Sequence, residues 1–308
     1  MKPEIYNKLN LFVGNTRAMS GFTWQSAYVK HIAAFLYTQE NRQVDIAAIQ
    51  NCYSFIKNQV GMFSPLRGQM SLGIATLLSL KSNQFMLFEE MRKVYAMMRN
   101  ARFYGSNSLV IAAYQIALHT APENYTKIIA NTRAFYDGMK SRHRFLTQQD
   151  DYIFSALLGL SNLNIAETLD YIEQIFQYLK GSLNGNICQR LAQIFVLSGE
   201  PNLTAEQMFA LMEALKAQKI SFNRNYTLPI LAVIAMDIVD INIVVRNIME
   251  SQALLRKQKG IGSSWMNMQD VLAIIASDNA SETKNNLLNV TLFTIVSSIL
   301  AQEAANTI

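Results

Sequence analysis

Apolar residues recur along most of the chain at the spacing of one-sided helices. The stretch from 128 to 142 is representative, with apolar side chains at Ile128, Ile129, Ala134, Phe135 and Met139. This spacing predicts an amphipathic helix. A short polar turn and a second, more continuously apolar stretch follow, ending near Leu160. The pattern therefore predicts a helical hairpin.

Polar residues in that turn indicate where the second helix begins. Thr147 is followed three residues later by Asp150. This is the spacing of a capping box, in which the two side chains accept hydrogen bonds from backbone N–H groups. Asp150 and Asp151 superficially resemble the acidic metal-binding motifs of isoprenoid synthases, but the second acidic cluster of such motifs is missing. We therefore expect Thr147 and Asp150 to be structural caps.

Two independent sets of positions repeat with a period close to forty residues. A basic residue near the end of each first helix recurs with gaps of 41, 40, 36 and 40 residues, at Arg99, Lys140, Lys180, Lys216 and Arg256. A small residue inside each second helix recurs with gaps of 38, 43, 36, 40 and 41 residues, at Ala75, Ala113, Ala156, Ala192, Ala232 and Ala273. Cap-type residues lie between the two sets, at Ser64, Ser106, Thr147, Asn184 or Asn186, Asn223 or Asn225, and Ser263 or Ser264.

The sequence therefore predicts an all-α protein, an α-solenoid (αα-superhelix) of about six helical-hairpin repeats. We expect one continuous domain with an N-terminal helical cap over residues 1–44, the repeat array over 45–278 and a C-terminal capping helix over 279–308. Within the N-terminal cap, the period predicts a helix from Trp24 to Tyr37. An all-helical protein without a true repeat would also show a rough period, and this alternative stays open.

Composition supports the all-α class and indicates in which cellular compartment the protein is expected. The 308 residues include 13 Gly and 5 Pro, too few for an all-β protein dense in turns. Cys52 and Cys188 are far apart and imply no disulfide framework. The N-terminus lacks the features of a signal peptide, and the apolar run from Leu287 to Leu300 is shorter than a membrane span. We expect a cytoplasmic protein without a membrane span.

No residue pattern in the chain predicts catalysis. The three histidines, His31, His119 and His143, have no carboxylate or cysteine at metal-ligand spacing, so no metal site is expected. No nucleophile elbow of the form G-x-S-x-G occurs. We predict no catalytic residue and no cofactor.

Stacked hairpins would place the ends of the first helices along one edge and their starts along the opposite edge. The first edge would form a basic rim that consists of Arg99, Lys140, Arg142, His143, Arg144, Lys180, Lys216 and Arg256. The opposite edge, which includes Glu167 and Asp170, would be acidic. Complementarity to helix dipoles alone sorts charges this way. A basic rim also attracts anionic partners, so it is a candidate site for binding an anion or a partner.

Three functions are compatible with this architecture. The favoured one is a non-enzymatic interaction scaffold that binds a peptide or protein segment in a groove between helices. The second is an enzyme whose hairpins close into an α/α-toroid around an acidic cavity. The third is a HEAT-like nucleic-acid binder that uses the basic rim, although the net charge is only +5. The sequence does not identify a small-molecule ligand.

Three short motifs also resemble a known family. They are FSPLRG at 63–68, HRFLTQQDDY at 143–152 and NGNICQRLAQI at 184–194. Together they resemble an uncharacterised all-helical family of Gram-positive bacteria, the domain-of-unknown-function family numbered four thousand and three. The resemblance extends over nearly the whole chain. It implies a bacterial cytosolic protein with no established activity, and therefore gives no catalytic residues to transfer.

Overall fold

The computed structural model describes residues 1–22, 26–61, 64, 66, 69–221, 224–258, 261, 264–282 and 286–305. Over these residues the chain is helical and contains no strand, which confirms the all-α class. None of the helices in this part of the chain is both long and apolar enough to cross a membrane. Thr23 and Trp24, at the start of one predicted helix, lie outside the described residues.

The described residues form fifteen α-helices and two short 3-10 helices. They are α1 (Pro3–Ala18), η1 (Met19–Gly21), α2 (Ala27–Gln39), α3 (Ile46–Gln59), α4 (Gln69–Ser79), α5 (Gln84–Asn100), α6 (Asn107–His119), η2 (Pro122–Asn124), α7 (Tyr125–Arg142), α8 (Asp151–Leu160), α9 (Ile165–Leu179), α10 (Gly185–Leu197), α11 (Pro201–Ala217), α12 (Arg224–Ala235), α13 (Ile241–Arg256), α14 (Ser264–Glu282) and α15 (Asn286–Ala305).

Contacts divide the chain into two compact units. Unit 1 consists of Met1–Ile46 and Ile194–Ile295, and unit 2 consists of Ala47–Gln193 and Val296–Ile308. The predicted division at residues 44 and 278 stays a prediction, as does the solenoid repeat. The succession of helical hairpins is compatible with that repeat.

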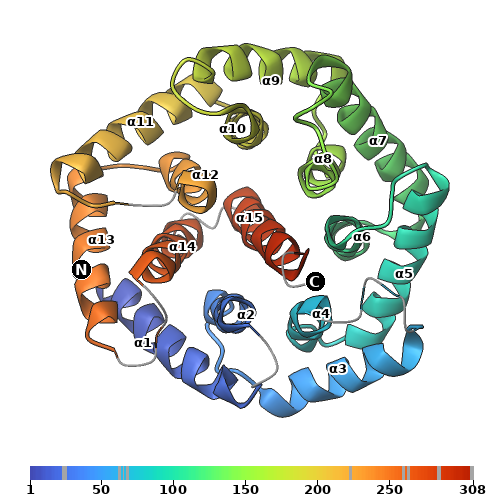
Figure 1. Ribbon diagram of the computed structural model, residues 1–308, viewed down its shortest axis with the longest axis horizontal. Coiled ribbons are helices and arrows are strands. Elements are labelled where there is room, and N and C mark those ends of the chain that lie inside the picture. The colour runs from blue at the N-terminus through green and yellow to red at the C-terminus, as the bar shows by residue number, and fades with distance from the viewer. Residues whose placement is uncertain are drawn as a thin grey trace. The chain divides into compact units, whose positions relative to one another are not determined.

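Unit 2 contains two layers of helices (Figure 1). The first layer contains α3, α5, α7 and α9, which follow one another side by side. The second layer contains α6 and α8, each packed on the preceding helix of its own hairpin and on one another. In the first layer, the ring of Phe55 on α3 contacts Phe85 and Phe88 on α5, with centroids 4.4 and 5.5 Å apart.

The layers differ in how completely their residues are buried. In α8, nine residues in a row are buried, from Asp151 to Gly159, whereas α7 buries one face with residues such as Ile129, Phe135 and Met139. A helix that is apolar all round must be covered on every side. Within unit 2 the C-terminal part of α15 contacts α6, since the Asn107 side chain at the start of α6 donates to the carbonyl of Ala301 over 3.4 Å.

Unit 1 brings the N-terminal helices against helices from late in the chain. Helix α1 packs on α13 and α14, and α2 packs on α14. The His31 Nδ1 atom on α2 lies 3.0 Å from Asp270 Oδ2 on α14, and both side chains are largely buried. The segment expected to cap the N-terminal end of a linear array therefore contacts the hairpin that is last in the predicted repeat.

Two of the predicted caps are confirmed. Ser106 accepts a hydrogen bond from the backbone N–H of Leu109 at the start of α6, and Asn184 accepts one from Ile187 at the start of α10. These bonds satisfy N–H groups that have no partner within the helix. The predicted cap positions Asn223 and Ser263 lie outside the described residues.

Candidate functional site

The residues of the predicted basic rim are divided between the two units. Unit 2 contains Arg99, Lys140, Arg142, His143, Arg144 and Lys180, and unit 1 contains Lys216 and Arg256. Most of them have intramolecular partners. Arg99 donates to the carbonyl of Phe103, Lys140 to the Tyr136 hydroxyl and Lys216 to Glu213, over 2.8, 2.9 and 2.5 Å.

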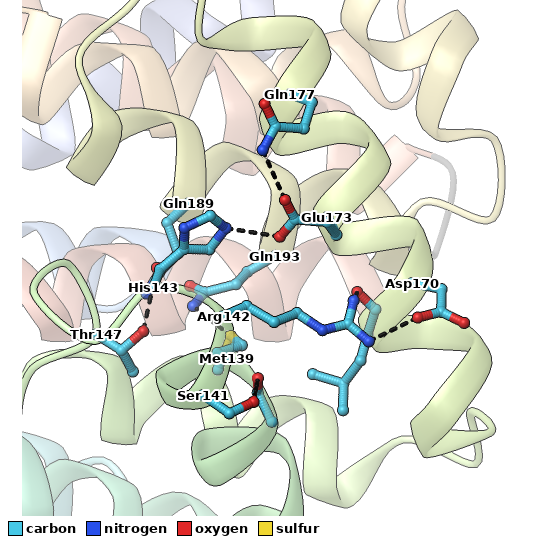
Figure 2. Close-up of polar contacts among 12 residues, drawn as sticks. Met139, Ser141, Arg142, His143, Thr147, Asp170, Glu173, Gln177, Gln189 and Gln193 are labelled. Carbon is cyan, nitrogen blue, oxygen red and sulfur yellow. Dashed lines mark hydrogen bonds and ion pairs between the residues drawn. The ribbon is translucent and has the colours of Figure 1, made fainter.

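Two more rim residues bind the neighbouring first-layer helix. Arg142, at the end of α7, donates to the carbonyl of Leu169 over 2.5 Å and to the Asp170 carboxylate on α9 over 2.6 Å (Figure 2). The prediction that Arg142 and Asp170 lie on opposite edges is therefore wrong. The physical reason is that the C-terminus of α7 packs against the body of α9 and not against its C-terminus.

His143 follows Arg142 and also contacts α9. Its Nε2 atom lies 2.6 Å from Glu173 Oε2 (Figure 2). Its ring is tilted by 36° to the ring of Phe176, with centroids 4.0 Å apart. Burial raises the pKa of Glu173, but hydrogen bonds from Gln177 and His143 outweigh it, so the pKa lies below its usual value. The pair thus joins α7 to α9, which accounts for His143 without a catalytic role.

Three rim residues remain open to solvent. Arg144, Lys180 and Arg256 are exposed, and their side chains make no hydrogen bond or ion pair within the described part of the chain. A contiguous anion-binding rim would need the other five side chains as well, and those are held by carbonyls, hydroxyls and carboxylates of the same chain. Intramolecular contacts therefore account for most of the predicted rim.

The turn between α7 and α8 does not contain the predicted capping box of Thr147 and Asp150. Asp150 makes no side-chain cap, and its carboxylate instead accepts from Arg190 on α10 over 3.2 Å. Asp151 Oδ2 accepts from the backbone N–H of Gln148 over 2.9 Å, which is one half of a capping box displaced by one residue. The displacement arises because the chain makes a tight turn before α8, with the N–H of Asp151 bonded to the carbonyl of Gln148.

Asp151 is the centre of a buried polar network. Its Oδ1 atom accepts from the amide groups of Gln189 and Gln193 on α10, over 2.8 and 2.9 Å. Thr147, fully buried, donates to Gln189 Oε1 over 3.2 Å. Burial, followed by the neighbouring Asp150 carboxylate, raises the pKa of Asp151 to about 6. Only 9% of Asp151 is exposed, so a substrate cannot reach this acid without opening the α8–α10 contact.

Arg133, which the sequence analysis did not single out, joins α7 to the end of α5. Its Nε atom lies 2.7 Å from Asp137 Oδ2, and its Nη1 atom donates to the carbonyls of Ala101 and Arg102 over 3.5 and 3.0 Å. The guanidinium also lies over the Phe103 ring, 5.3 Å from its centroid. The i,i+4 spacing of Arg133 and Asp137 is a sequence signal for their pairing, but no local pattern predicts the bonds to α5.

Arg133 lies in a groove between α5 and α7 with a volume of about 610 Å³. Helix α5 and the turn after it contribute Met97, Asn100, Ala101 and Arg102, and α7 contributes Thr126, Ile129, Ala130, Arg133, Ala134 and Asp137. The alanines leave the helix backbones open to close approach. Apolar, amide, hydroxyl and charged groups therefore line one continuous depression on unit 2.

A smaller cavity of about 300 Å³ lies at the end of α3 in unit 2. Its walls include Val60, Met91 and Tyr95, together with Ser64 and Leu66 of the FSPLRG motif. Burial raises the pKa of Tyr95, so its hydroxyl stays protonated at neutral pH. Among the described lining residues, no carboxylate lines this cavity, and Asp137 is the one carboxylate in the α5–α7 groove.

The described residues contain no candidate metal site and no candidate reactive thiol. No group of three or more His, Cys, Asp or Glu side chains in this part of the chain is arranged to hold a metal ion. Cys52 and Cys188 are both buried, and burial raises the pKa of Cys52 to about 11. A buried thiol with a raised pKa is a poor nucleophile.

Comparison with known proteins identifies the family but no function. No curated protein and no solved structure matches the chain significantly. The model of one family, described as a protein of unknown function (DUF4003), matches residues 16–305. This match covers nearly the whole chain, including the HRFLTQQDDY and NGNICQRLAQI motifs, and the chain therefore belongs to the DUF4003 family.

Proposed function

We propose that this protein is a non-enzymatic cytoplasmic scaffold that binds a peptide or protein segment in the groove between α5 and α7. The observation that carries the proposal is the groove itself, with its volume of about 610 Å³ and its alanine-lined walls. Small side chains permit a bound backbone to approach both helices closely. Met97, which is half-buried, adds apolar surface, the main source of affinity in such contacts.

The dimensions of the groove suit an extended segment. Thr126 and Asp137 are eleven positions apart on α7, which corresponds to about 17 Å along a helix. An extended chain rises about 3.3 Å per residue, so about five residues fit along this length. Asn100 and Thr126 make no side-chain hydrogen bond within the described residues, which leaves both groups available to a ligand.

The enzyme alternative has less support. A helical hydrolase or cyclase needs a pair of carboxylates that a substrate reaches. In unit 2 the paired carboxylates Asp150 and Asp151 accept bonds from Arg190, Gln189 and Gln193, and Asp151 is buried. The nucleic-acid alternative is weakened by the intramolecular partners of the rim, because salt-dependent binding requires several cations free to neutralise phosphates.

The proposal is tested by blocking the groove. Peptides would be selected from a random phage-displayed library on the purified full-length chain, and their affinities measured for wild type and Ala130→Trp. Ala130 is an exposed groove residue, so a tryptophan there fills the groove without entering the core. We expect at least about tenfold weaker binding, which corresponds to about 1.4 kcal/mol.

Gln174→Trp is the matched control, since Gln174 is exposed on α9 and does not line the groove. It should bind the selected peptides as tightly as wild type does. Circular dichroism must show that both variants are folded. The proposal would be abandoned if no peptide were selected, or if Ala130→Trp retained the affinity of the wild type.

A further inference from the structure

We infer that the segment bound in the α5–α7 groove is an acidic peptide, and that Arg102 is the residue that selects it. This inference rests on the function proposed above and adds the chemistry of the ligand. It is based on the backbone conformation of Arg102, on the absence of a structural role for its side chain, and on the balance of charges along the groove.

Arg102 occupies a position where glycine fits better. It follows α5 with φ of +67°, and the N–H of Phe103 bonds to the carbonyl of Met98 over 3.1 Å, which is the Schellman motif. Glycine is preferred there because a Cβ atom is strained in the left-handed region. The same motif ends α11, where Lys219 has φ of +57° and Ile220 bonds to Leu215.

The side chain of Arg102 does not compensate for this strain within the fold. It is exposed, and within the described residues it makes no hydrogen bond or ion pair. The bonds that Arg102 does make use its backbone, including its carbonyl oxygen, which accepts from Arg133. A strained residue without a structural role is a candidate for function.

The charges along the groove leave Arg102 as the cation that is not neutralised. Arg133 and Asp137 form an ion pair at 2.7 Å, so their charges cancel. The remaining lining residues, other than Arg102, are uncharged. A segment with a carboxylate side chain therefore complements the groove better than a neutral or basic one.

The end of α5 would by itself repel a carboxylate, because carbonyl groups give a helix C-terminus a partial negative charge. Arg133 offsets this effect by donating to the carbonyls of Ala101 and Arg102. An acidic side chain near Arg102 would therefore lie beside carbonyl groups that already accept hydrogen bonds from the Arg133 guanidinium.

A peptide fits these features better than a nucleic acid does. Nucleic-acid affinity depends on neutralising several phosphates along a backbone. Among its described lining residues the groove offers a single uncompensated cation beside alanines and Met97, which suits a chain with one or two acidic side chains and small apolar neighbours.

The test uses three synthetic peptides labelled with tetramethylrhodamine. They share one alanine and leucine background and carry Glu, Gln or Lys at the same positions. Fluorescence anisotropy would measure their affinities for wild type, Arg102→Gly, Arg102→Lys and Lys219→Gly. Lys219→Gly is the matched control, because it makes the same backbone change and removes the same charge at the end of α11 in unit 1.

We expect the wild type to bind the Glu peptide at least about threefold more tightly than the Gln peptide, with a difference that shrinks as salt is added. Arg102→Gly should abolish this difference, Arg102→Lys should keep part of it, and Lys219→Gly should leave it unchanged. A structural role alone would not produce this pattern, since glycine relieves strain at both positions.

The inference is overturned if the wild type does not distinguish Glu from Gln peptides, or if Arg102→Gly still does. If those peptides bind equally and Ala130→Trp still weakens them, the proposed function survives and the acidic preference alone fails. If none of the three binds, the inference is overturned, whereas the proposed function is decided by the peptides selected from the random library. An oligothymidylate that binds more tightly than the Glu peptide and depends on Arg102 would also overturn the inference, in favour of nucleic acid.

Discussion

The carboxyl group of Asp151 is protonated more easily in the folded chain than in an unfolded one. Its ordinary pKa is 3.8, and burial with the nearby Asp150 carboxylate raises it to about 6. Because the folded state holds this proton more tightly, the group stabilises the fold most below its ordinary pKa. That contribution is lost as the pH rises through about 6. Glu173 acts in the opposite sense, since its pKa is lowered, and a variant is needed to isolate Asp151.

Asp151→Asn provides that isolation, because an amide does not titrate in this range. As the pH is lowered from about 7 to about 4, the unfolding free energy of the wild type should rise relative to the variant, by on the order of 2 kcal/mol. Urea titrations followed by circular dichroism at several pH values would measure the difference. Curves for the two proteins that run parallel over this range would show that Asp151 does not titrate as inferred.

At the scale of single residues, the sequence predicted the correct turn before α8 but not the hydrogen bonds within it. The spacing of Thr147 and Asp150 matches a capping box, yet the cap is made by Asp151, and Thr147 instead donates to Gln189. Sequence spacing does not specify whether a chain makes a tight turn before a helix, and a shift of one residue exchanges the two aspartates. Gln189 lies 42 positions away from Thr147, so its contact depends on tertiary packing.

At the scale of elements, α7 and α8 approach each other closely through Gly159. A Cβ atom added there would lie 2.8 Å from the backbone nitrogen of Thr132 and closer still to its hydroxyl. Both obstructing groups belong to α7, and a backbone atom cannot rotate away. The approach of these two helices therefore requires glycine at this position.

Gly159→Ala should consequently destabilise the protein by about 1–3 kcal/mol, the usual cost of overpacking, although alanine favours helix by about 1 kcal/mol. Gly138→Ala is a suitable comparison, since Gly138 also lies within a helix and its added Cβ would meet the side chain of Leu169, which can move. We expect it to be nearly neutral. Thermal and urea unfolding would compare the two, and equal stabilities would refute the close-approach argument.

The existence and type of the elements were predictable because amphipathic spacing and caps are local signals. Ser106 and Asn184 cap helices at the predicted turns. How neighbouring helices meet was not predictable in the same way. Arg142 was expected far from Asp170 because both were assigned to helix ends, but α7 ends against the body of α9. That arrangement is determined by side-chain packing, which a repeat period does not describe.

At the scale of the whole chain, the most distant contacts lie within unit 1. Lys8 on α1 is buried and lies 3.9 Å from Asp278 and 3.3 Å from Ser277, both on α14. No periodic pattern in the sequence indicates that these residues meet. The N-terminal hairpin is therefore an integral part of unit 1, and its charged contact with α14 has a measurable consequence.

Replacing Lys8 by methionine would remove the cation that lies 3.9 Å from the buried Asp278 carboxylate, at a cost of about 3 kcal/mol. Adding Asp278→Asn should recover part of this loss, because the buried charge is removed as well. Lys93→Met is the matched control: Lys93 pairs with Glu90 at the surface of α5, where a lost ion pair costs under about 1 kcal/mol.

Native-state hydrogen exchange would locate the effect. In Lys8→Met, amides of α14 should exchange faster, and the double variant should restore part of their protection. If α14 kept its full protection in Lys8→Met, the ion pair would contribute nothing to unit 1. Because removing either group takes away a favourable contact of the other, the separate costs of Lys8→Met and Asp278→Asn should sum to more than the cost of the double variant.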